Sequence, residues 1–224
     1  VTDNVTEVKK FEVYSSGIKS MNTNDSNVDD VVHNAFGIKI GSLSAPDGID
    51  SVEEVKIVNS SLEANDDFGM GIGAENLKNY VFEGSQANDN GQAGVYFNTD
   101  LDVLDGEILN SAFNNNGTKI SLSSPDDRNG SNYFNTAGFW IESDNGNLAR
   151  DSQRYSLTVR DSEFSNNGIK TSNDDAWVSG LRINTAGNVG DLLINEDSVA
   201  SGNEDSGFDI FAGNQFTCHT CDKC

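Results

Sequence analysis

Short apolar runs alternate with clusters of Asn, Gly and Asp along most of the chain. Runs of this kind between turn-forming residues predict β-strands separated by tight turns. The main runs are VEEVKIV (52–58), LKNYVF (77–82), LDGEIL (104–109), YSLTV (155–159) and VGDLLI (189–194). Several are followed by a second run, as in AGVYF (93–97), TKISL (118–122) and GFDIF (207–211). The pattern therefore predicts an all-β protein built from many short strands.

A repeated frame connects these strands. Residues 111–117 read SAFNNNG and residues 162–168 read SEFSNNG, and the same frame, Ser-x-apolar-x-x-Asn, starts again at Ser60, Ser85 and Ser198. The starts are separated by 25, 26, 51 and 36 residues. The interval of 51 fits either two periods or one period with a long excursion, and the interval of 36 fits one period with a shorter excursion. Fixed periods of this length are typical of stacked repeat architectures.

One turn of a parallel β-helix has this form, with each frame position lying above its counterpart in the next coil. The apolar positions of the frame are then expected to stack in the core, and the asparagines to form a ladder at a bend. The expected core stack is Leu62, Ala87, Phe113, Phe164 and Ala200, and the expected ladder is Asn65, Asn90, Asn116, Asn167 and Asn203. A β-sandwich is the rival fold, but a frame recurring every 25 or 26 residues is less natural there.

The SxFxxNG coil resembles the right-handed parallel β-helix proteins, the group that includes pectate-lyase-like enzymes and alginate epimerases. The resemblance covers roughly residues 50–215, about three quarters of the chain. It implies the fold, since the motif is a turn-and-stack signature, and it says little about activity. Pectate-lyase-like enzymes use acidic residues to hold calcium and an Arg or Lys as base, but no family signature is present here. The Asp-Pro-His-Glu motif of alginate epimerases is also absent.

The repeat divides the chain into three parts. Residues 1–49 are expected to form an initial strand or arm and a short cap helix, because residues 27–37 place apolar side chains on one helical face between Asn27 and Gly37. Residues 50–215 form the coils, and residues 216–224 form an irregular tail. No comparable cap is evident at the C-terminal side, and strand edges left open are contact sites for other chains.

Two excursions from the coil pattern are expected near residues 123–153 and 171–183. They contain Trp140, Trp177 and Tyr133. Functional residues on solenoids often lie on such insertions, so the three aromatic residues are a candidate sugar platform. The alternative is that both tryptophans lie in strands and pack in the core.

Composition narrows the partners. The chain of 224 residues carries a formal charge of -22, which repels nucleic acid and anionic lipid. It has no apolar run of the length that spans a membrane. The sequence begins with Val1 rather than with an initiator methionine, as is expected of a mature chain after export or of a trimmed chain. Asn-x-Ser/Thr sequons favour an extracellular or cell-surface protein and begin at Asn4, Asn24, Asn59, Asn116 and Asn129.

Paired carboxylates in the excursions are candidate calcium ligands, since hard cations bind clustered oxygen atoms. The pairs are Asp126 with Asp127 and Asp174 with Asp175. No EF-hand loop is present, and acidic pairs also arise on solvated turns in so acidic a chain. Calcium therefore remains one hypothesis, and catalysis at these carboxylates a weaker one.

All three cysteines, Cys218, Cys221 and Cys224, lie in the last seven residues together with His219. Covalent haem needs Cys-x-x-Cys-His, which is incomplete here, and zinc would need a strained chelate from the adjacent Cys218 and His219. An intermolecular disulfide, or a tail without a structural role, fits the residues better. With no other cysteine in the chain, such a bond must join tail to tail or tail to another protein.

These patterns favour a secreted structural or cell-surface subunit, rather than an enzyme, that self-associates end to end. Phe208, Ile210 and Phe211 on the last coil are the expected contact, and the tail cysteines would reinforce it. The alternatives are a carbohydrate-active β-helix, lyase or epimerase, and a non-catalytic glycan-binding adhesin.

Overall fold

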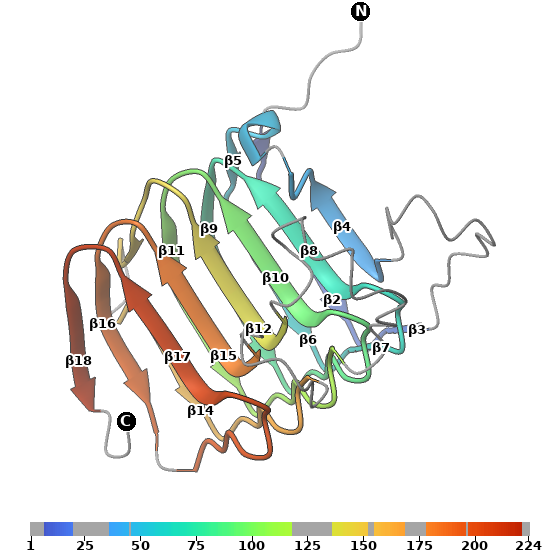
Figure 1. The fold of residues 1–224 in the computed structure, drawn as a ribbon. Coiled ribbons are helices and arrows are strands. Elements are labelled where there is room, and N and C mark those ends of the chain that lie inside the picture. Colours follow the sequence, from blue (N-terminus) through green and yellow to red (C-terminus); the bar gives the residue numbers. More distant parts are fainter. Residues whose placement is uncertain are drawn as a thin grey trace, which may run out of the picture.

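The computed structural model describes residues 7–19, 36–44, 46–117, 136–151, 155–168, 178–195 and 197–220. This part of the chain is all-β and contains no α-helix, only one short 3-10 turn, η1 (Pro46–Gly48). All strand pairings in it are parallel. The arrangement is compatible with a β-solenoid, as the stack of strands coloured from blue to red in Figure 1 shows.

Two large sheets and a narrow third face make up the fold. The six-stranded sheet consists of β4 (Ile38–Gly41), β8 (Phe68–Ala74), β10 (Ala93–Thr99), β12 (Thr136–Ser143), β15 (Val178–Thr185) and β17 (Ser206–Ala212). The ten-stranded sheet consists of β1 (Glu7–Val8), β2 (Phe11–Tyr14), β5 (Ser51–Val52), β6 (Val55–Val58), β9 (Asn76–Glu83), β11 (Val103–Leu109), β13 (Leu148–Ala149), β14 (Leu157–Arg160), β16 (Val189–Ile194) and β18 (Phe216–Thr220). The third face contains β3 (Gly17–Lys19) and β7 (Ser61–Glu63).

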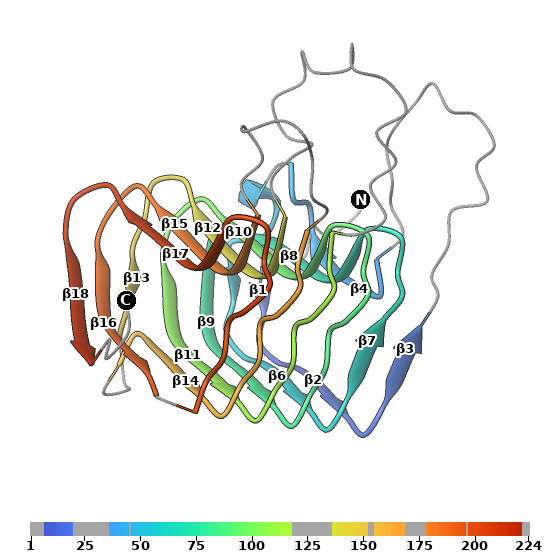
Figure 2. The same ribbon diagram turned by 60° about the horizontal axis from the view of Figure 1, so that its bottom comes forward.

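We call one pass along the six-stranded sheet, the ten-stranded sheet and the third face a rung. The first rung described is Glu7–Lys19, with β1, β2 and β3, and the last is residues 204–220, with β17 and β18. Figure 2 shows the rungs lying next to one another in sequence order. The sheets thus extend on both sides beyond residues 50–215, where the repeat is evident in the sequence.

The repeated frame forms the third face of each rung, as its period predicts. Isolated parallel bridges connect Ser61 to Gln86, Gln86 to Ala112, Ala112 to Glu163, and Glu163 to Val199. Because Ala112 pairs directly with Glu163, the interval of 51 residues is one rung with an excursion rather than two rungs. The interval of 36 residues is likewise a single rung.

The predicted core stack lies inside the molecule. Leu62, Ala87, Phe113 and Phe164 are buried, and the rings of Phe113 and Phe164 stack with centroids 5.2 Å apart. Ala200, on the outermost frame, is only partly buried against the same core. Stacked rings of identical position on successive rungs bury large apolar areas, which is the main stabilising term for a fold of this kind.

The predicted asparagine ladder is present and fully hydrogen-bonded. Asn65 Nδ2 donates to Asn90 Oδ1 over 2.9 Å, and Asn90 Nδ2 donates to Asn116 Oδ1 over 3.0 Å. The series continues through Asn167 to Asn203. The backbone N–H of each donor residue reaches the same acceptor oxygen, so each rung is tied to the next by two bonds. Buried amides are stabilising when paired in this way.

The ladder asparagines do not adopt the left-handed conformation that their bend position predicts. The residue before each of them does, with φ near +57°: the series is Ala64, Asp89, Asn115, Asn166 and, with φ +65°, Gly202. A second left-handed residue precedes the serine of most frames, in the series Asn59, Gly84, Asn110 and Asp161. Two left-handed residues per frame produce the two bends that bound the third face.

The frame serines form a second ladder, to which the sequence pattern assigns no role. Ser60 N donates to Ser85 Oγ over 3.2 Å, and Ser85 N donates to Ser111 Oγ over 3.1 Å. Ser16 N donates to Ser60 Oγ, which shows that the first rung carries the same frame position. The hydroxyl of each frame serine therefore accepts a hydrogen bond from the backbone N–H of the serine one rung earlier. That N–H follows a left-handed bend and has no strand partner.

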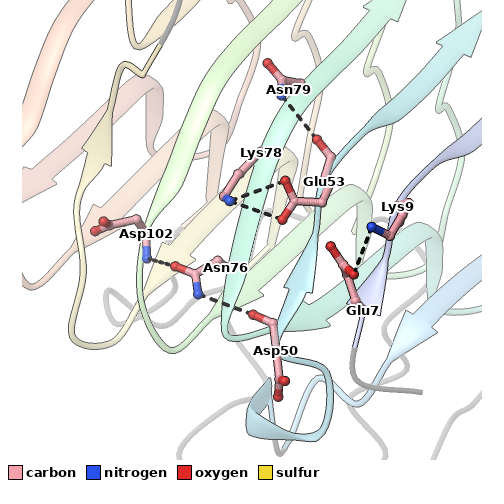
Figure 3. Close-up of polar contacts among 8 residues, drawn as sticks. All are labelled: Glu7, Lys9, Asp50, Glu53, Asn76, Lys78, Asn79 and Asp102. Carbon is pink, nitrogen blue, oxygen red and sulfur yellow. Dashed lines mark hydrogen bonds and ion pairs between the residues drawn. The ribbon is translucent and has the colours of Figure 1, made fainter.

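A third ladder follows the corner between the two large sheets. Asp102 N donates to Asn76 Oδ1 over 3.3 Å, Asn147 N and Nδ2 both donate to Asp102 Oδ1, and Asn188 N and Nδ2 donate to Asn147 Oδ1. Figure 3 shows its first step, where Asn76 Nδ2 also reaches Asp50 O. Its amides donate toward the N-terminal rungs, whereas those of the first ladder donate toward the C-terminal rungs.

Two sequence predictions need correction or lie outside the described residues. The cap helix of 27–37 falls mostly outside them, and Phe36 and Gly37, its described end, are non-helical and lead into β4. The excursions predicted at 123–153 and 171–183 are too long, because β12 (Thr136–Ser143) and β15 (Val178–Thr185) lie within the six-stranded sheet. Their mixed small and aromatic residues do not alternate clearly, since both faces of these strands are buried.

Candidate functional sites

The outer face of the six-stranded sheet carries an unusual column of residues. Strand register aligns Gly71, Tyr96, Trp140, Arg182 and Asp209 on successive rungs. Neighbouring strands of a sheet lie about 4.8 Å apart, so side chains in such a column contact one another directly. The column joins rings in the middle of the sheet to charged groups near the last rung.

Rings in contact with one another extend this column towards the first strands of the sheet. The Phe36 ring stacks on Phe68 with centroids 5.1 Å apart, Phe68 stacks on Tyr96 at 5.5 Å, and Tyr96 lies against Trp140 at 4.4 Å. The Arg182 guanidinium carbon lies 5.2 Å from the centre of the Trp140 ring. Gly71 leaves room for Phe36, since a Cβ there would lie 2.8 Å from the Phe36 ring.

Polar contacts fix the column from the side. The Tyr96 hydroxyl donates to Glu142 Oε2 over 2.6 Å, and Asn184 Nδ2 lies 3.4 Å from Glu142 Oε1. Burial and the Glu142 carboxylate raise the pKa of Tyr96 well above its usual range. Arg182 Nε lies 3.8 Å from Asp209 Oδ2. Burial raises the pKa of Asp209, with Arg182 acting against that shift and Asp205 adding to it.

Trp140 was one candidate for a sugar platform, and the structure places it in strand β12, buried. Its ring contacts Tyr96 and the Arg182 guanidinium, and only 7% of the residue is exposed. Sugar stacking needs a free aromatic face. Trp140 therefore packs as a structural ring of the column, and the other two platform candidates, Tyr133 and Trp177, lie outside the described residues.

The two terminal rungs form the second candidate site. Inward-facing positions are fully buried on the middle rungs, where Phe97, Phe139 and Leu181 have no exposed surface. The matching positions of the outermost rungs are only partly buried. They are Val8, Phe11, Val13 and Ile18 on the first rung, and Phe208, Ile210 and Ala212 on the last. Among the described residues, the apolar core is thus less completely covered at both ends than in the middle of the stack.

Large apolar side chains are also exposed at these ends. Five such residues are 39–60% exposed in the described part of the chain: Tyr14, Leu101, Val199, Phe211 and Phe216. Tyr14 lies on the first rung, Phe211 and Phe216 lie on the last, and Val199 is the outermost residue of the third face. Only Leu101 belongs to the middle of the stack. Apolar exposure gathered at open strand edges is typical of association surfaces.

Of the predicted contact residues, Phe208 and Ile210 face the core and Phe211 faces outward. Strand β17 pairs with β15 on one side, and no strand pairs with its other side in the described part of the chain. Phe216 and Val199 were not predicted. The exposure of each depends on its rung being outermost, which local sequence does not reveal.

The cysteine tail begins on an edge strand. The backbone of Cys218 aligns with Leu192 in β16, and His219 lies next to it in β18, the outermost strand at this end of the ten-stranded sheet. Cys221 and Cys224 lie outside the described residues.

Of the candidate glycosylation and calcium-binding residues, some lie in the described part of the chain and some outside it. Asn59 is exposed in a left-handed turn, so its sequon is accessible. Asn116 is buried and its amide belongs to the ladder, so no glycan is expected there in the folded protein. The other sequon asparagines (Asn4, Asn24, Asn129) and the calcium candidates (Asp126, Asp127, Asp174, Asp175) lie outside the described residues.

Within the described ranges, no three His, Cys, Asp or Glu side chains gather as a metal site would require. No helix of that same part is long and apolar enough to cross a membrane. Comparisons with protein families, with curated proteins and with solved structures gave no match for this chain.

Proposed function

We propose that the protein is a right-handed parallel β-helix that serves as a secreted structural or cell-surface subunit, with copies associating end to end. One observation supports this most: the core positions that are fully buried on the middle rungs are partly exposed on the first and last rungs. A second copy stacked on either end would bury them. The right-handed sense follows the general rule for parallel strands joined by crossovers.

Strand register indicates what such stacking joins. The column that begins at Val8 ends at Phe216, and the column that begins at Gly17 ends at Val199. A copy added in register would continue the Val8 column directly from Phe216, whereas the column of the third face ends one rung earlier in the described part of the chain. Edge-to-edge addition also supplies partners for open backbone N–H and C=O groups.

The cysteines add covalent links between chains in this proposal. Cys218 belongs to the edge strand of the last rung, so the backbone leads into the cysteine tail at the end of the stack. Secretion is consistent with the accessible sequon at Asn59 and with a surface charge that keeps an extracellular protein soluble.

Light scattering after size-exclusion chromatography, with electron microscopy of the same fractions, tests the proposal. The protein is expected to form oligomers or filaments, and adding a reductant shows how far they depend on covalent links between cysteines. Phe216→Asp should reduce association, because it places a charge in the proposed contact. Leu101→Asp is the matched control, since Leu101 is an exposed apolar residue of a middle rung. A monomer under all conditions, or equal effects of the two variants, contradicts the proposal.

A further inference from the structure

The two ends of the stack differ in charge. The first rung, Glu7–Lys19, holds three lysines and two glutamates, whereas residues 204–220 hold three carboxylates and no Lys or Arg. The formal charge is thus +1 at one end and -3 at the other. The whole chain carries a net charge of -22, so copies repel one another on average, and association needs a local region of positive charge. The first rung supplies such a region.

The lysines of the first rung are available to a partner. Lys9, Lys10 and Lys19 are more than half exposed, although they also contact Glu7, Glu12 and Glu63 on their own chain. On the last rung, Glu204 and Asp205 are exposed and Asp209 is paired with Arg182. Two last rungs placed face to face would bring six carboxylates together without a compensating lysine.

From this we infer that the end-to-end contact is polar: the acidic last rung of one copy binds the lysine-bearing first rung of a second copy. The inference rests on the proposed function and specifies its partner surface. A head-to-tail contact of this kind repeats without closing and generates a filament, whereas a tail-to-tail contact would stop at a dimer.

The cysteines then have a separate role. All of them lie at the C-terminal end, so a head-to-tail joint has thiols on one side only. The axial contact is therefore non-covalent and persists in reductant. A tail-to-tail joint would instead place the cysteines of both chains together and would depend on their disulfides.

Exchanging the charges of the two ends tests the polarity. Lys9→Glu with Lys10→Glu changes the first rung from +1 to -3, and Glu204→Lys with Asp205→Lys changes the last rung from -3 to +1. Each double variant alone should lose association in light scattering. The variant with all four changes, and an equimolar mixture of the two double variants, should recover it. Glu83→Lys with Asp144→Lys is the control for the second double variant, because it makes the same change in net charge on exposed residues of middle rungs.

Two results would overturn the inference while leaving the proposed function in place. One is association of Lys9→Glu/Lys10→Glu at the wild-type level. The other is the loss of all association in reductant, which indicates a tail-to-tail joint. A wild-type protein that is monomeric throughout would instead contradict the proposed function itself. Circular dichroism of each variant confirms that a loss of association is not a loss of folding.

Discussion

Asp102 occupies a position in the corner ladder where its neighbours on other rungs are asparagines. An asparagine there accepts two bonds through Oδ1 and donates one through Nδ2, as Asn147 does. Asp102 accepts both bonds from Asn147, but its carboxylate has no hydrogen to donate to Asn76 Oδ1. Only its backbone N–H makes that bond, over 3.3 Å. The ladder is therefore incomplete at this residue.

Asp102→Asn is expected to stabilise the protein by about 1 kcal/mol, because it adds a side-chain hydrogen bond and removes one negative charge from an acidic molecule. Denaturant unfolding followed by circular dichroism measures the change. Asn147→Asp is the matched control and should destabilise, since it removes the Nδ2 donor one rung further on. Equal shifts for the two variants would show that the ladder amides do not act as described.

Two buried tyrosines differ in how their hydroxyls are satisfied. The Tyr80 hydroxyl is fully buried and finds no hydrogen-bond partner among the described residues, while the Tyr96 hydroxyl donates to Glu142 over 2.6 Å. Tyr80→Phe is expected to be neutral or stabilising by about 1 kcal/mol, because it removes an unpaired polar group. Tyr96→Phe is expected to destabilise by about 1–2 kcal/mol, because it removes a hydrogen bond to a charged group.

Thermal unfolding of both phenylalanine variants beside the wild type provides the measurement. The two changes delete the same atom, so the opposite signs isolate the hydrogen bond. A loss of stability in Tyr80→Phe that matches that of Tyr96→Phe would mean that the Tyr80 hydroxyl is paired in solution.

At the level of the strand and turn, the frame is the part of the fold that sequence specifies well. Ser, an apolar residue and Asn recur at fixed spacing because each meets the same residue on the next rung, so Phe113 and Asn116 were assigned correctly to core and ladder. The corner ladder was missed because an aspartate interrupts its asparagines and its spacing is irregular: Asn76, Asp102, Asn147 and Asn188 stand 26, 45 and 41 residues apart. The outer column was missed for a similar reason: Tyr96 and Glu142 meet only through strand register.

The glycines of the six-stranded sheet form a column of their own at the bend beside the asparagine ladder. A Cβ at Gly69, Gly94, Gly138 or Gly180 would lie 2.5–2.7 Å from the carbonyl oxygen of the glycine on the next rung. Real side chains do not approach backbone oxygen so closely, so the strand would have to shift on several rungs at once. Glycine is therefore required at this point of each rung.

Gly138→Ala is expected to destabilise by about 3 kcal/mol, because its Cβ would meet Phe113 O, Gly180 O and Asn167 Nδ2 in a packed interior. Gly48→Ala is the control: a Cβ there meets nothing within 4 Å, and the change should be within about 1 kcal/mol of neutral. Denaturant midpoints of the two variants decide the matter. A Gly138→Ala protein as stable as the wild type would show that the rungs separate easily at this corner.

Across the whole molecule, contacts between neighbouring rungs run along the axis of the stack, and the groups that lack such contacts lie at its two ends. The ladders and the ring column tie each rung to its neighbours, and the exposed core positions and the charge difference lie at the two ends. A stack of this kind resembles other repeat proteins, in which stability comes from contacts between neighbouring repeats and the terminal repeats need covering. Association of copies and stability of one copy then depend on the same type of contact.

Stability is expected to fall at alkaline pH, and the buried tyrosines determine the sign. Burial raises the pKa of Tyr80 and of Tyr96 above the usual value, and the negative charges of Asp105 and Glu142 add to it. Both groups therefore keep their protons in the folded state above about pH 10, where the unfolded chain releases them. Their contribution to folding is complete below about pH 10 and decreases by up to about 1.4 kcal/mol per pH unit per tyrosine above it.

Urea unfolding between about pH 8 and about pH 11 measures the decrease. Tyr80→Phe and Tyr96→Phe should each make it shallower, whereas loss of lysine ion pairs affects all three proteins alike and cancels in the difference; parallel curves would contradict the assignment.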